Sequence, residues 1–253
     1  MTDETSRDLR LEIAIGLKNA DLWGLGDPYL AAGIEALRSG LAGDAVQPLS
    51  RAAARNPQSG TAHFLLGEAY RASGLDDAAA VAYAEAVRRD PDLAPAWNAL
   101  GRSLVARGLA DRAATAFETA LLIEPGLAAA RNNLGVLRLQ AGHVKDAERL
   151  FVRALEDDPD LAAAQANLGL LLRRRGEGAA AELRYRAALD LDPLNTDARY
   201  NLAVLLRAGG RVEDARRELR RLLSIDPVDP DAAGLLLQIE GAGGLRAGPG
   251  LPP

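Results

Sequence analysis

The chain has 253 residues with a formal net charge of −5 at pH 7, and 48% of its residues are hydrophobic although only 4% are aromatic. This hydrophobic fraction is large enough to form a continuous core. Because aromatic side chains are scarce, we expect the core to consist mainly of Ala and Leu side chains. The acidic balance argues against nucleic-acid binding by general electrostatic attraction. The absence of cysteine excludes disulfides and thiolate metal sites.

Residues 1–25 form a separate N-terminal segment. They lack a basic stretch followed by an apolar core, and no part of the chain approaches roughly 18 uninterrupted apolar residues, so we expect a cytoplasmic protein without a membrane span. Five apolar residues alternate strictly, as in a strand, and three of them (Leu9, Ile13 and Leu17) also share one helical face. A helix packed on the next element is favoured, and a strand that pairs with a partner is the alternative.

Residues 26–229 repeat with a period of 34 residues. Proline, glycine and alanine each recur at this interval. The prolines are Pro57, Pro91, Pro125, Pro159, Pro193 and Pro227, and the glycines are Gly40, Gly74, Gly108, Gly142, Gly176 and Gly210. The alanines are Ala45, Ala79, Ala113, Ala147, Ala181 and Ala215. A fixed period of this length is typical of a repeat array in which each repeat packs on its neighbours. The six predicted repeats are 26–59, 60–93, 94–127, 128–161, 162–195 and 196–229.

The third repeat shows the content of one unit. Its first half carries residues spaced by three and four, as on one helical face: Trp97, Leu100, Gly101 and Leu104. Gly108 can end this helix in the left-handed conformation. A second helix carries Ala113, Phe117 and Ala120, and it must end near Glu124 because Pro125 lacks an amide hydrogen. Each repeat is therefore predicted to be two helices that need their neighbours to bury their apolar faces.

These residues resemble the tetratricopeptide repeat family. Its pattern is Trp-x-x-Leu-Gly-x-x-Tyr, then Ala-x-x-x-Phe, then Ala, then Pro. The second repeat matches with His63, Leu66, Gly67, Tyr70, Ala79, Tyr83, Ala86 and Pro91. The first and sixth repeats depart from the pattern, as the ends of a finite array do. The resemblance implies an all-α fold, a right-handed solenoid (superhelix) of helix-turn-helix repeats.

Two further segments follow the sixth repeat. Residues 230–240 repeat the phase of a first helix without a second one, so we expect a helix that caps the last apolar face. Residues 241–253 are so rich in Gly and Pro that we expect a disordered tail.

The sequence offers no catalytic or cofactor-binding set. His63 stands where the family places a large packed residue, and His143 lies in a turn after Gly142. No Ser/His/Asp set, paired metal ligands or phosphate-binding loop is recognisable. We therefore expect no enzyme activity, no metal and no cofactor.

The resemblance does imply a binding face. In this family the first helix of each repeat lines the concave side of the superhelix, at positions 2, 5, 6, 9, 12 and 13 of the 34. The asparagines at positions 5 and 6 are Asn98, Asn132, Asn133, Asn167 and Asn201, and the arginines at positions 9, 12 and 13 are Arg71, Arg102, Arg173, Arg174 and Arg207. Carboxamides can bond the backbone of an extended peptide, and guanidinium groups can pair with acidic groups.

The asparagines also resemble those in the superhelical repeats of protein O-GlcNAc transferases, where such a ladder holds substrate peptides. The sequence thus predicts an adaptor that binds an extended, partly acidic peptide or a partner helix in its concave groove. Three alternatives stay open. The asparagines could serve repeat stacking only, the protein could recruit substrates to a separate enzyme such as a transferase, or it could be a self-associating scaffold.

Overall fold

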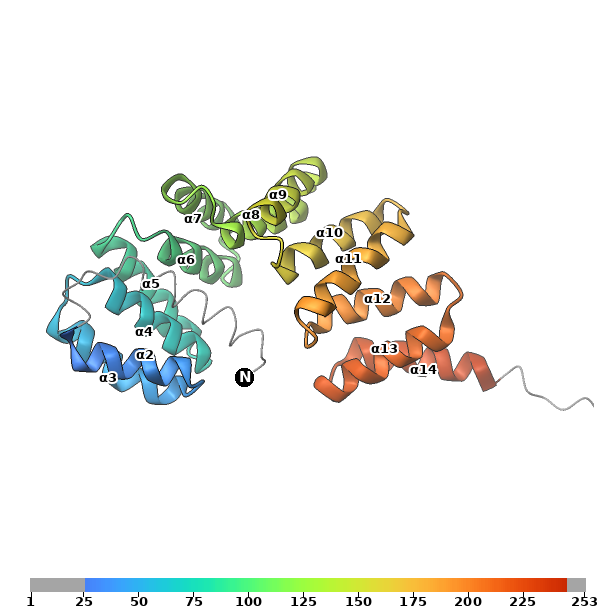
Figure 1. The fold of residues 1–253 in the computed structure, drawn as a ribbon, viewed down its shortest axis with the longest axis horizontal. Helices are drawn as coiled ribbons and strands as arrows, with labels where there is room; N and C mark the ends of the chain where they lie inside the picture. Colours follow the sequence, from blue (N-terminus) through green and yellow to red (C-terminus); the bar gives the residue numbers. More distant parts are fainter. Residues whose placement is uncertain (1–25, 245–253) are drawn as a thin grey trace, which may run out of the picture. The chain divides into compact units, whose positions relative to one another are not determined.

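The computed structural model describes residues 26–244, and within this range it contains thirteen α-helices and no strand (Figure 1). The helices are α2 (Pro28–Arg38), α3 (Ala42–Arg55), α4 (Gly60–Ala72), α5 (Asp76–Arg89), α6 (Ala94–Ala106), α7 (Ala110–Ile123), α8 (Ala128–Gln140), α9 (Val144–Asp157), α10 (Ala162–Arg174), α11 (Gly178–Leu191), α12 (Thr196–Ala208), α13 (Val212–Ile225) and α14 (Pro230–Gly244). The even-numbered helices from α2 to α12 are the first helices of the six predicted repeats. The all-α repeat architecture is confirmed.

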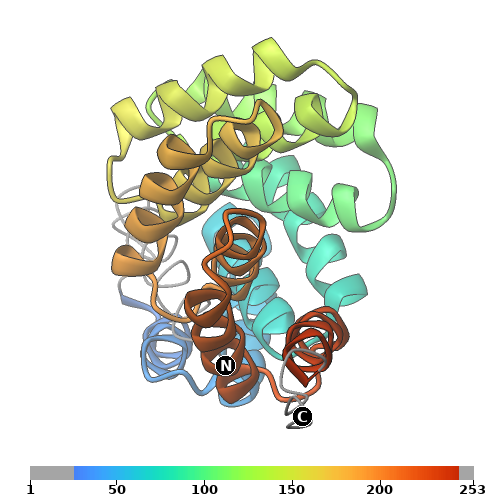
Figure 2. The ribbon, with the colours of Figure 1, turned by 90° about the vertical axis from the view of Figure 1, so that its right-hand side faces the viewer.

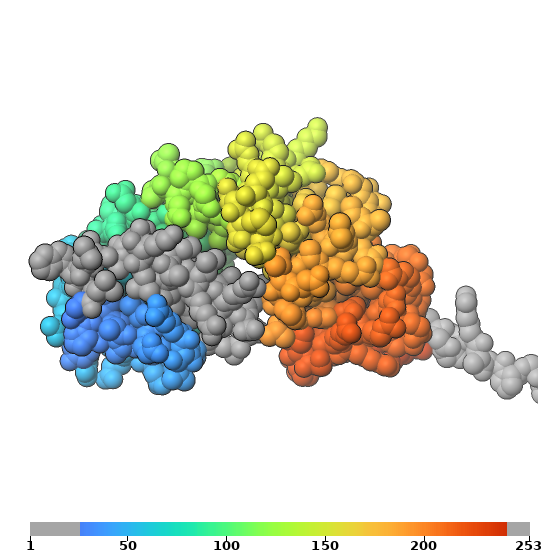
Figure 3. All heavy atoms as spheres, viewed as in Figure 1, coloured from blue at the N-terminus to red at the C-terminus, as the bar shows by residue number. Residues whose placement is uncertain are grey.

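The chain divides into two compact units, here named the N-terminal unit (to Pro159) and the C-terminal unit (from Asp160). Within each unit, every helix packs on the preceding and following ones, as both ribbon views show (Figures 1 and 2). First helices of successive repeats also touch, α6 with α8 and α10 with α12 among them. Side chains fill the spaces between the ribbons of the C-terminal unit in the space-filling view (Figure 3). Each unit is therefore a stack of helix pairs.

The periodic glycines end the first helices as predicted. All six have positive φ angles, between 72° and 82°. In the third repeat, the Gly108 amide donates to the Val105 carbonyl and the Leu109 amide donates to the Leu104 carbonyl, each at 2.9 Å. These two hydrogen bonds satisfy carbonyl groups that the end of α6 would leave open.

A second set of glycines lets the two helices of a repeat approach closely. A Cβ atom added at Gly101 would lie 2.4 Å from Cε1 of Phe117. A Cβ atom added at Gly67 would lie 2.5 Å from Cε1 of Tyr83. The ring of the second helix therefore packs directly on the backbone of the first helix. The rings at this position are fully buried in four repeats, as Tyr83, Phe117, Phe151 and Tyr185.

In four repeats, the side chain at position 4 contacts the loop before the repeat. Trp97 Nε1 donates to the Pro91 carbonyl at 2.8 Å. Arginine takes this role in two other repeats, with Arg131 donating to the Pro125 carbonyl and Arg199 donating to the Pro193 carbonyl. His63 Nε2 lies 3.4 Å from the Pro57 carbonyl oxygen. Its position is explained by this link between repeats.

Helix α14 covers the end of the C-terminal unit. Its residues Ala232, Leu235 and Ile239 are buried in one cluster with Leu206 and Leu219. The helix continues to Gly244, four residues beyond the end expected from its composition, because each residue added to a formed helix gains a backbone hydrogen bond. The predictions for residues 1–25 and for the tail after Gly244 lie outside the described residues. Over residues 26–244, no helix has both the length and the apolar character that crossing a bilayer requires.

Candidate functional site

The asparagines of the N-terminal unit lie between neighbouring first helices. Asn98 on α6 and Asn132 on α8 are buried, with 2% and 5% of their surface exposed. Asn133 Nδ2 on α8 donates to Asn98 Oδ1 at 2.9 Å, so this pair links two repeats. A carboxamide can make up to four hydrogen bonds, so the half-buried Asn133 keeps capacity beyond this one. Its contact with a peptide stays a prediction.

The asparagines of the C-terminal unit are half-buried on α10 and α12, two helices that contact each other. Asn201 Nδ2 donates to the Asp197 carbonyl at 2.9 Å, one turn earlier on its own helix. This bond fixes the side chain without linking repeats. Asn167 occupies the same position on α10. The proposed role of both as peptide contacts also stays a prediction.

Two of the predicted arginines pair with a carboxylate inside the N-terminal unit. Arg71 Nη2 lies 2.7 Å from Glu68 Oε2, and Arg102 Nη2 lies 3.5 Å from Glu68 Oε1. Glu68 is fully buried, and the Tyr83 hydroxyl donates to its Oε1 at 2.5 Å. Burial raises the pKa of Tyr83 well above its ordinary value, and the negative charge of Glu68 adds to this increase. Arg71 and Arg102 thus neutralise an internal charge.

The same two arginines keep part of their surface, with 23% and 29% of their side chains exposed. They line a small hollow of about 220 Å³ together with Asp76 and Asp77. Because these carboxylates share the hollow with the guanidinium groups, its charge is largely balanced. This hollow is less suited to an acidic ligand than the sequence alone indicated.

Arg173 and Arg174 lie in the last turn of α10. Arg174 is exposed, whereas Arg173 is half-buried beside the buried Tyr185. Burial raises the pKa of Tyr185, and the adjacent Arg173 guanidinium opposes part of this increase. Arg173 Nε and Tyr185 Oη are both buried, and neither has a hydrogen-bond partner among residues 26–244.

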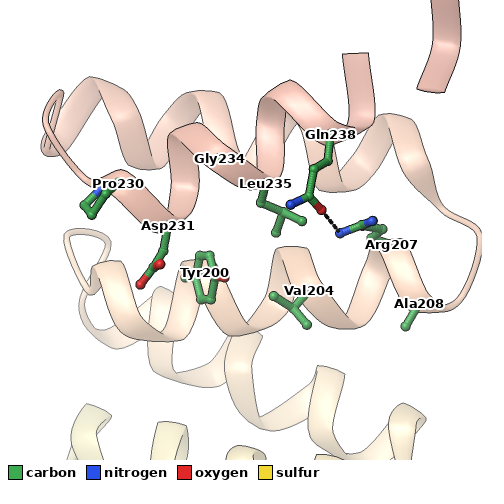
Figure 4. Close-up of a pocket in the computed structure, with 9 residues that line it drawn as sticks. All are labelled: Tyr200, Val204, Arg207, Ala208, Pro230, Asp231, Gly234, Leu235 and Gln238. Atoms are coloured by element: carbon green, nitrogen blue, oxygen red, sulfur yellow. Dashed lines mark hydrogen bonds between the residues drawn. The ribbon is translucent and has the colours of Figure 1, made fainter. Parts of the chain in front are cut away.

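Arg207 lies in a cleft between α12 and α14 with a volume of about 520 Å³ (Figure 4). Helix α12 contributes Tyr200, Val204, Arg207 and Ala208, which are positions 5, 9, 12 and 13 of the sixth repeat. Helix α14 contributes Pro230, Asp231, Gly234, Leu235 and Gln238. The cleft therefore lies on the first-helix face that the sequence pointed to.

The cleft has polar ends and an apolar middle. Arg207 Nη1 donates to Gln238 Oε1 at 3.0 Å at one end. Tyr200 and Asp231 stand at the other end, with Val204 and Leu235 between them (Figure 4). A Cβ added at Gly234 would meet no atom within 4 Å, so the missing side chain leaves open space. Such a lining suits a short extended segment with an apolar side chain and flanking polar groups.

Sequence comparison agrees with the repeat geometry. One model of the tetratricopeptide repeat matches residues 104–168 and 172–239, more than half of the chain, and a second matches residues 30–94. The chain belongs to the tetratricopeptide repeat family. No curated protein matches its sequence.

Solved structures show the same fold. A hetero-tetramer of Cut9 and Hcn1 from the APC/C matches with a TM-score of 0.79 at 22% identity, over 92% of this chain and 46% of that chain. PilW, a type IV pilus biogenesis factor, matches with a TM-score of 0.69 at 20% identity over 86% of this chain and 100% of that chain. PilF of Pseudomonas aeruginosa matches with a TM-score of 0.68 at 20% identity, over 84% and 96%. This tetratricopeptide repeat protein thus spans less than half of the Cut9–Hcn1 chain, and at these identities the likeness is one of fold.

The half of the cleft that α14 supplies is not among the residues that the repeat pattern predicts. The sequence predicts residues 230–240 only as a cap, although they keep the phase of a first helix. Continuing the numbering into a seventh repeat places Asp231, Gly234, Leu235 and Gln238 at positions 2, 5, 6 and 9. These are positions that face a ligand in tetratricopeptide repeat proteins.

Within residues 26–244, no cluster of three or more side chains suited to holding a metal ion is present.

Proposed function

We propose that this protein is a non-enzymatic adaptor that binds an extended segment of a partner protein across the first helices of its repeats. The observation that carries this proposal is the open cleft between α12 and α14. Its walls are α12 and α14, which share the phase of a first helix, and it combines an apolar centre with Arg207, whose hydrogen-bond partner among residues 26–244 is the neutral Gln238.

The lining indicates the chemistry of the segment. An apolar side chain of the partner would cover Val204 and Leu235 in the middle of the cleft. An acidic side chain would displace the neutral Gln238 from Arg207, because a charge-assisted hydrogen bond is about twice as strong as a neutral one. Asn201 on α12 and Asn167 on α10 would bond the backbone of the same segment. We therefore favour an extended, partly acidic segment as the ligand.

The similar structures support a role in assemblies. Cut9 was solved in a hetero-tetramer with Hcn1, and PilW acts in the biogenesis of type IV pili. We take from them the general role of the tetratricopeptide repeat as a scaffold for other proteins.

Filling the cleft tests the proposal. Peptides selected from a random displayed library against the full chain would be measured by fluorescence anisotropy with the wild type and with Gly234→Leu. The new side chain would occupy the space over Val204 and Leu235, so affinity should fall about tenfold or more, the loss expected when one apolar side chain stays unburied. Gly43→Leu is the matched control, since it adds the same atoms on α3 at another position without a neighbour within 4 Å.

Equal binding by the wild type and by Gly234→Leu would exclude the cleft as the site. Light scattering on the same samples separates the competing scaffold function, because a mass that grows with concentration in the absence of peptide would indicate self-association.

The asparagines need their own comparison. Replacing Asn133, Asn167 and Asn201 together by Ala should weaken binding of the selected peptides with little change in helicity. Asn98→Ala is the control, because it removes the same bond between α6 and α8 while leaving the three position-6 side chains in place. If both variants lose stability equally and neither loses affinity, the asparagines serve repeat stacking alone.

A further inference from the structure

The second repeat contains a complete binding arrangement for a carboxylate. Glu68 stands at position 9 and is fully buried. Its Oε1 accepts from the Tyr83 hydroxyl, and its Oε2 accepts from Arg71 at position 12. Arg102, at position 9 of the next repeat, approaches Oε1 to 3.5 Å. One phenol and two guanidinium groups thus surround a single carboxylate.

The fifth repeat has the same phenol and the same guanidinium group without the carboxylate. Tyr185 and Arg173 stand at the positions of Tyr83 and Arg71, but Leu170 takes the place of Glu68. The Tyr185 hydroxyl and Arg173 Nε are both buried and have no hydrogen-bond partner among the described residues. Native proteins pair nearly all buried polar atoms. Other arginine nitrogens among residues 26–244 also lack a partner, so a missing group is indicated by the buried Tyr185 hydroxyl, which lies beside Arg173 where the second repeat has a carboxylate.

We propose that Arg173 and Tyr185 bind a carboxylate of the ligand over Leu170, at the place that the Glu68 carboxylate takes in the second repeat. Leu170 is half-buried, so this place is reached from the surface. Position 9 of the next repeat holds Val204 where Arg102 covers Glu68, so the second guanidinium group is absent and the site stays open. The exposed Arg174 adds a positive charge.

This site extends the cleft by one repeat. Val204 lines the cleft between α12 and α14, and α12 contacts α10, which carries Arg173. A segment lying in the cleft would therefore reach Arg173 with an acidic side chain or with its terminal carboxylate. The inference depends on the proposed function for the origin of the ligand, but the carboxylate site can be tested on its own.

The test follows the Nε–Hε signal of Arg173 by NMR in the labelled full chain, where its loss in Arg173→Gln identifies it. The probe is the peptide Ser-Val-Glu-Val-Ser, acetylated and amidated so that glutamate is its one carboxylate. Its glutamine counterpart is the control, and the same glutamine peptide with a free C-terminus separates a terminal carboxylate from a side-chain one. We expect a saturable shift with either carboxylate and roughly 10- to 100-fold weaker binding of the neutral peptide.

Variants of the protein make the test decisive. Leu170→Glu should supply the carboxylate internally and abolish probe binding, whereas Leu170→Met, which is similar in volume and uncharged, should keep it. Tyr185→Phe should weaken the probe without lowering the urea midpoint of the free protein, because its hydroxyl has no partner to lose among residues 26–244. Tyr83→Phe should lower that midpoint, because it removes the hydrogen bond to Glu68.

Equal affinity for the glutamate and glutamine probes would overturn the inference, as would unchanged probe binding by Leu170→Glu. The proposed function fails separately, when Gly234→Leu leaves the binding of the selected peptides unchanged. Loss of peptide binding in Gly234→Leu with no effect of Arg173→Gln would keep the adaptor function and remove the carboxylate site.

Discussion

Adding one methyl group at Gly101 should destabilise the protein, although the same change stabilises most helices. The new Cβ would lie 2.4 Å from Phe117 Cε1, 2.7 Å from Cδ1 and 2.9 Å from Cζ. These distances are far below van der Waals contact. Phe117 is fully buried, so its ring has no free volume into which it could move.

The size of the effect follows from two opposing contributions. Alanine in a helix interior is favoured over glycine by about 0.5–1 kcal/mol. Overpacking a core by a methyl group costs about 1–3 kcal/mol. For Gly101→Ala the packing cost should prevail and leave a net loss of about 1 kcal/mol, with an upper bound of about 2.5 kcal/mol. Gly234→Ala makes the same chemical change with no atom within 4 Å, so only the gain of about 0.5–1 kcal/mol should remain.

Urea unfolding followed by circular dichroism gives the two midpoints. Because repeat arrays can unfold in parts, hydrogen exchange of the amides in α7 and in α14 should be measured on the same variants. The double variant Gly101→Ala/Phe117→Leu is the rescue control, since it copies the sixth repeat, where Ala203 and Leu219 hold these positions. Midpoints that move in the same direction for Gly101→Ala and Gly234→Ala would refute the argument from ring contact.

Three other outcomes are expected. Hydrogen bonds from Arg88 and Arg89 lower the pKa of Glu85 from 4.5 to about 2, so NMR titration of its carboxyl should give a midpoint of about 2 that rises in Arg88→Ala/Arg89→Ala. The contribution of the Glu85 carboxylate to stability should be lost as the pH falls from 4.5 toward 2. Burial and the Glu68 charge raise the pKa of Tyr83 above 10.0, so this hydroxyl ionises in the unfolded chain at a lower pH than in the folded protein. The urea midpoint of the wild type should therefore fall above pH 10, and that of Tyr83→Phe should fall less. Gly108→Ala should lower the melting temperature through a cost of about 1 kcal/mol, because φ at this residue is +72°.

The helix boundaries could be predicted because they depend on single residues with strong local preferences. Gly108 ends α6 through its own backbone conformation, and Pro125 forces α7 to end at Ile123. The close approach of α6 and α7 could also be read from Gly101 and Phe117, because both recur at fixed positions of the repeat. Local rules copied along the chain therefore determine the fold.

The partners of polar side chains could not be predicted in this way. The period places Arg71 and Arg102 on the first-helix face, but it does not show that both turn to Glu68, since Arg102 is 34 residues away from it. Likewise, the period predicts Asn133 and Asn98 on the same face, but it does not show that they bond to each other. Such pairs depend on side-chain rotamers and on which residue each neighbouring repeat happens to carry.

The partners of the first-helix arginines differ between the two units. This difference indicates where an acidic ligand would gain the most binding free energy. In the N-terminal unit, Arg71 and Arg102 already face the carboxylate of Glu68, so an acidic ligand would compete with an existing ion pair. In the C-terminal unit, Arg207 bonds the neutral Gln238, and Arg173 lies beside the neutral phenol of Tyr185. Charge pairing adds the most free energy where no opposite charge is present beforehand. Position 12 therefore serves stability through Arg71 in the N-terminal unit, whereas we propose that it serves recognition through Arg173 and Arg207 in the C-terminal unit.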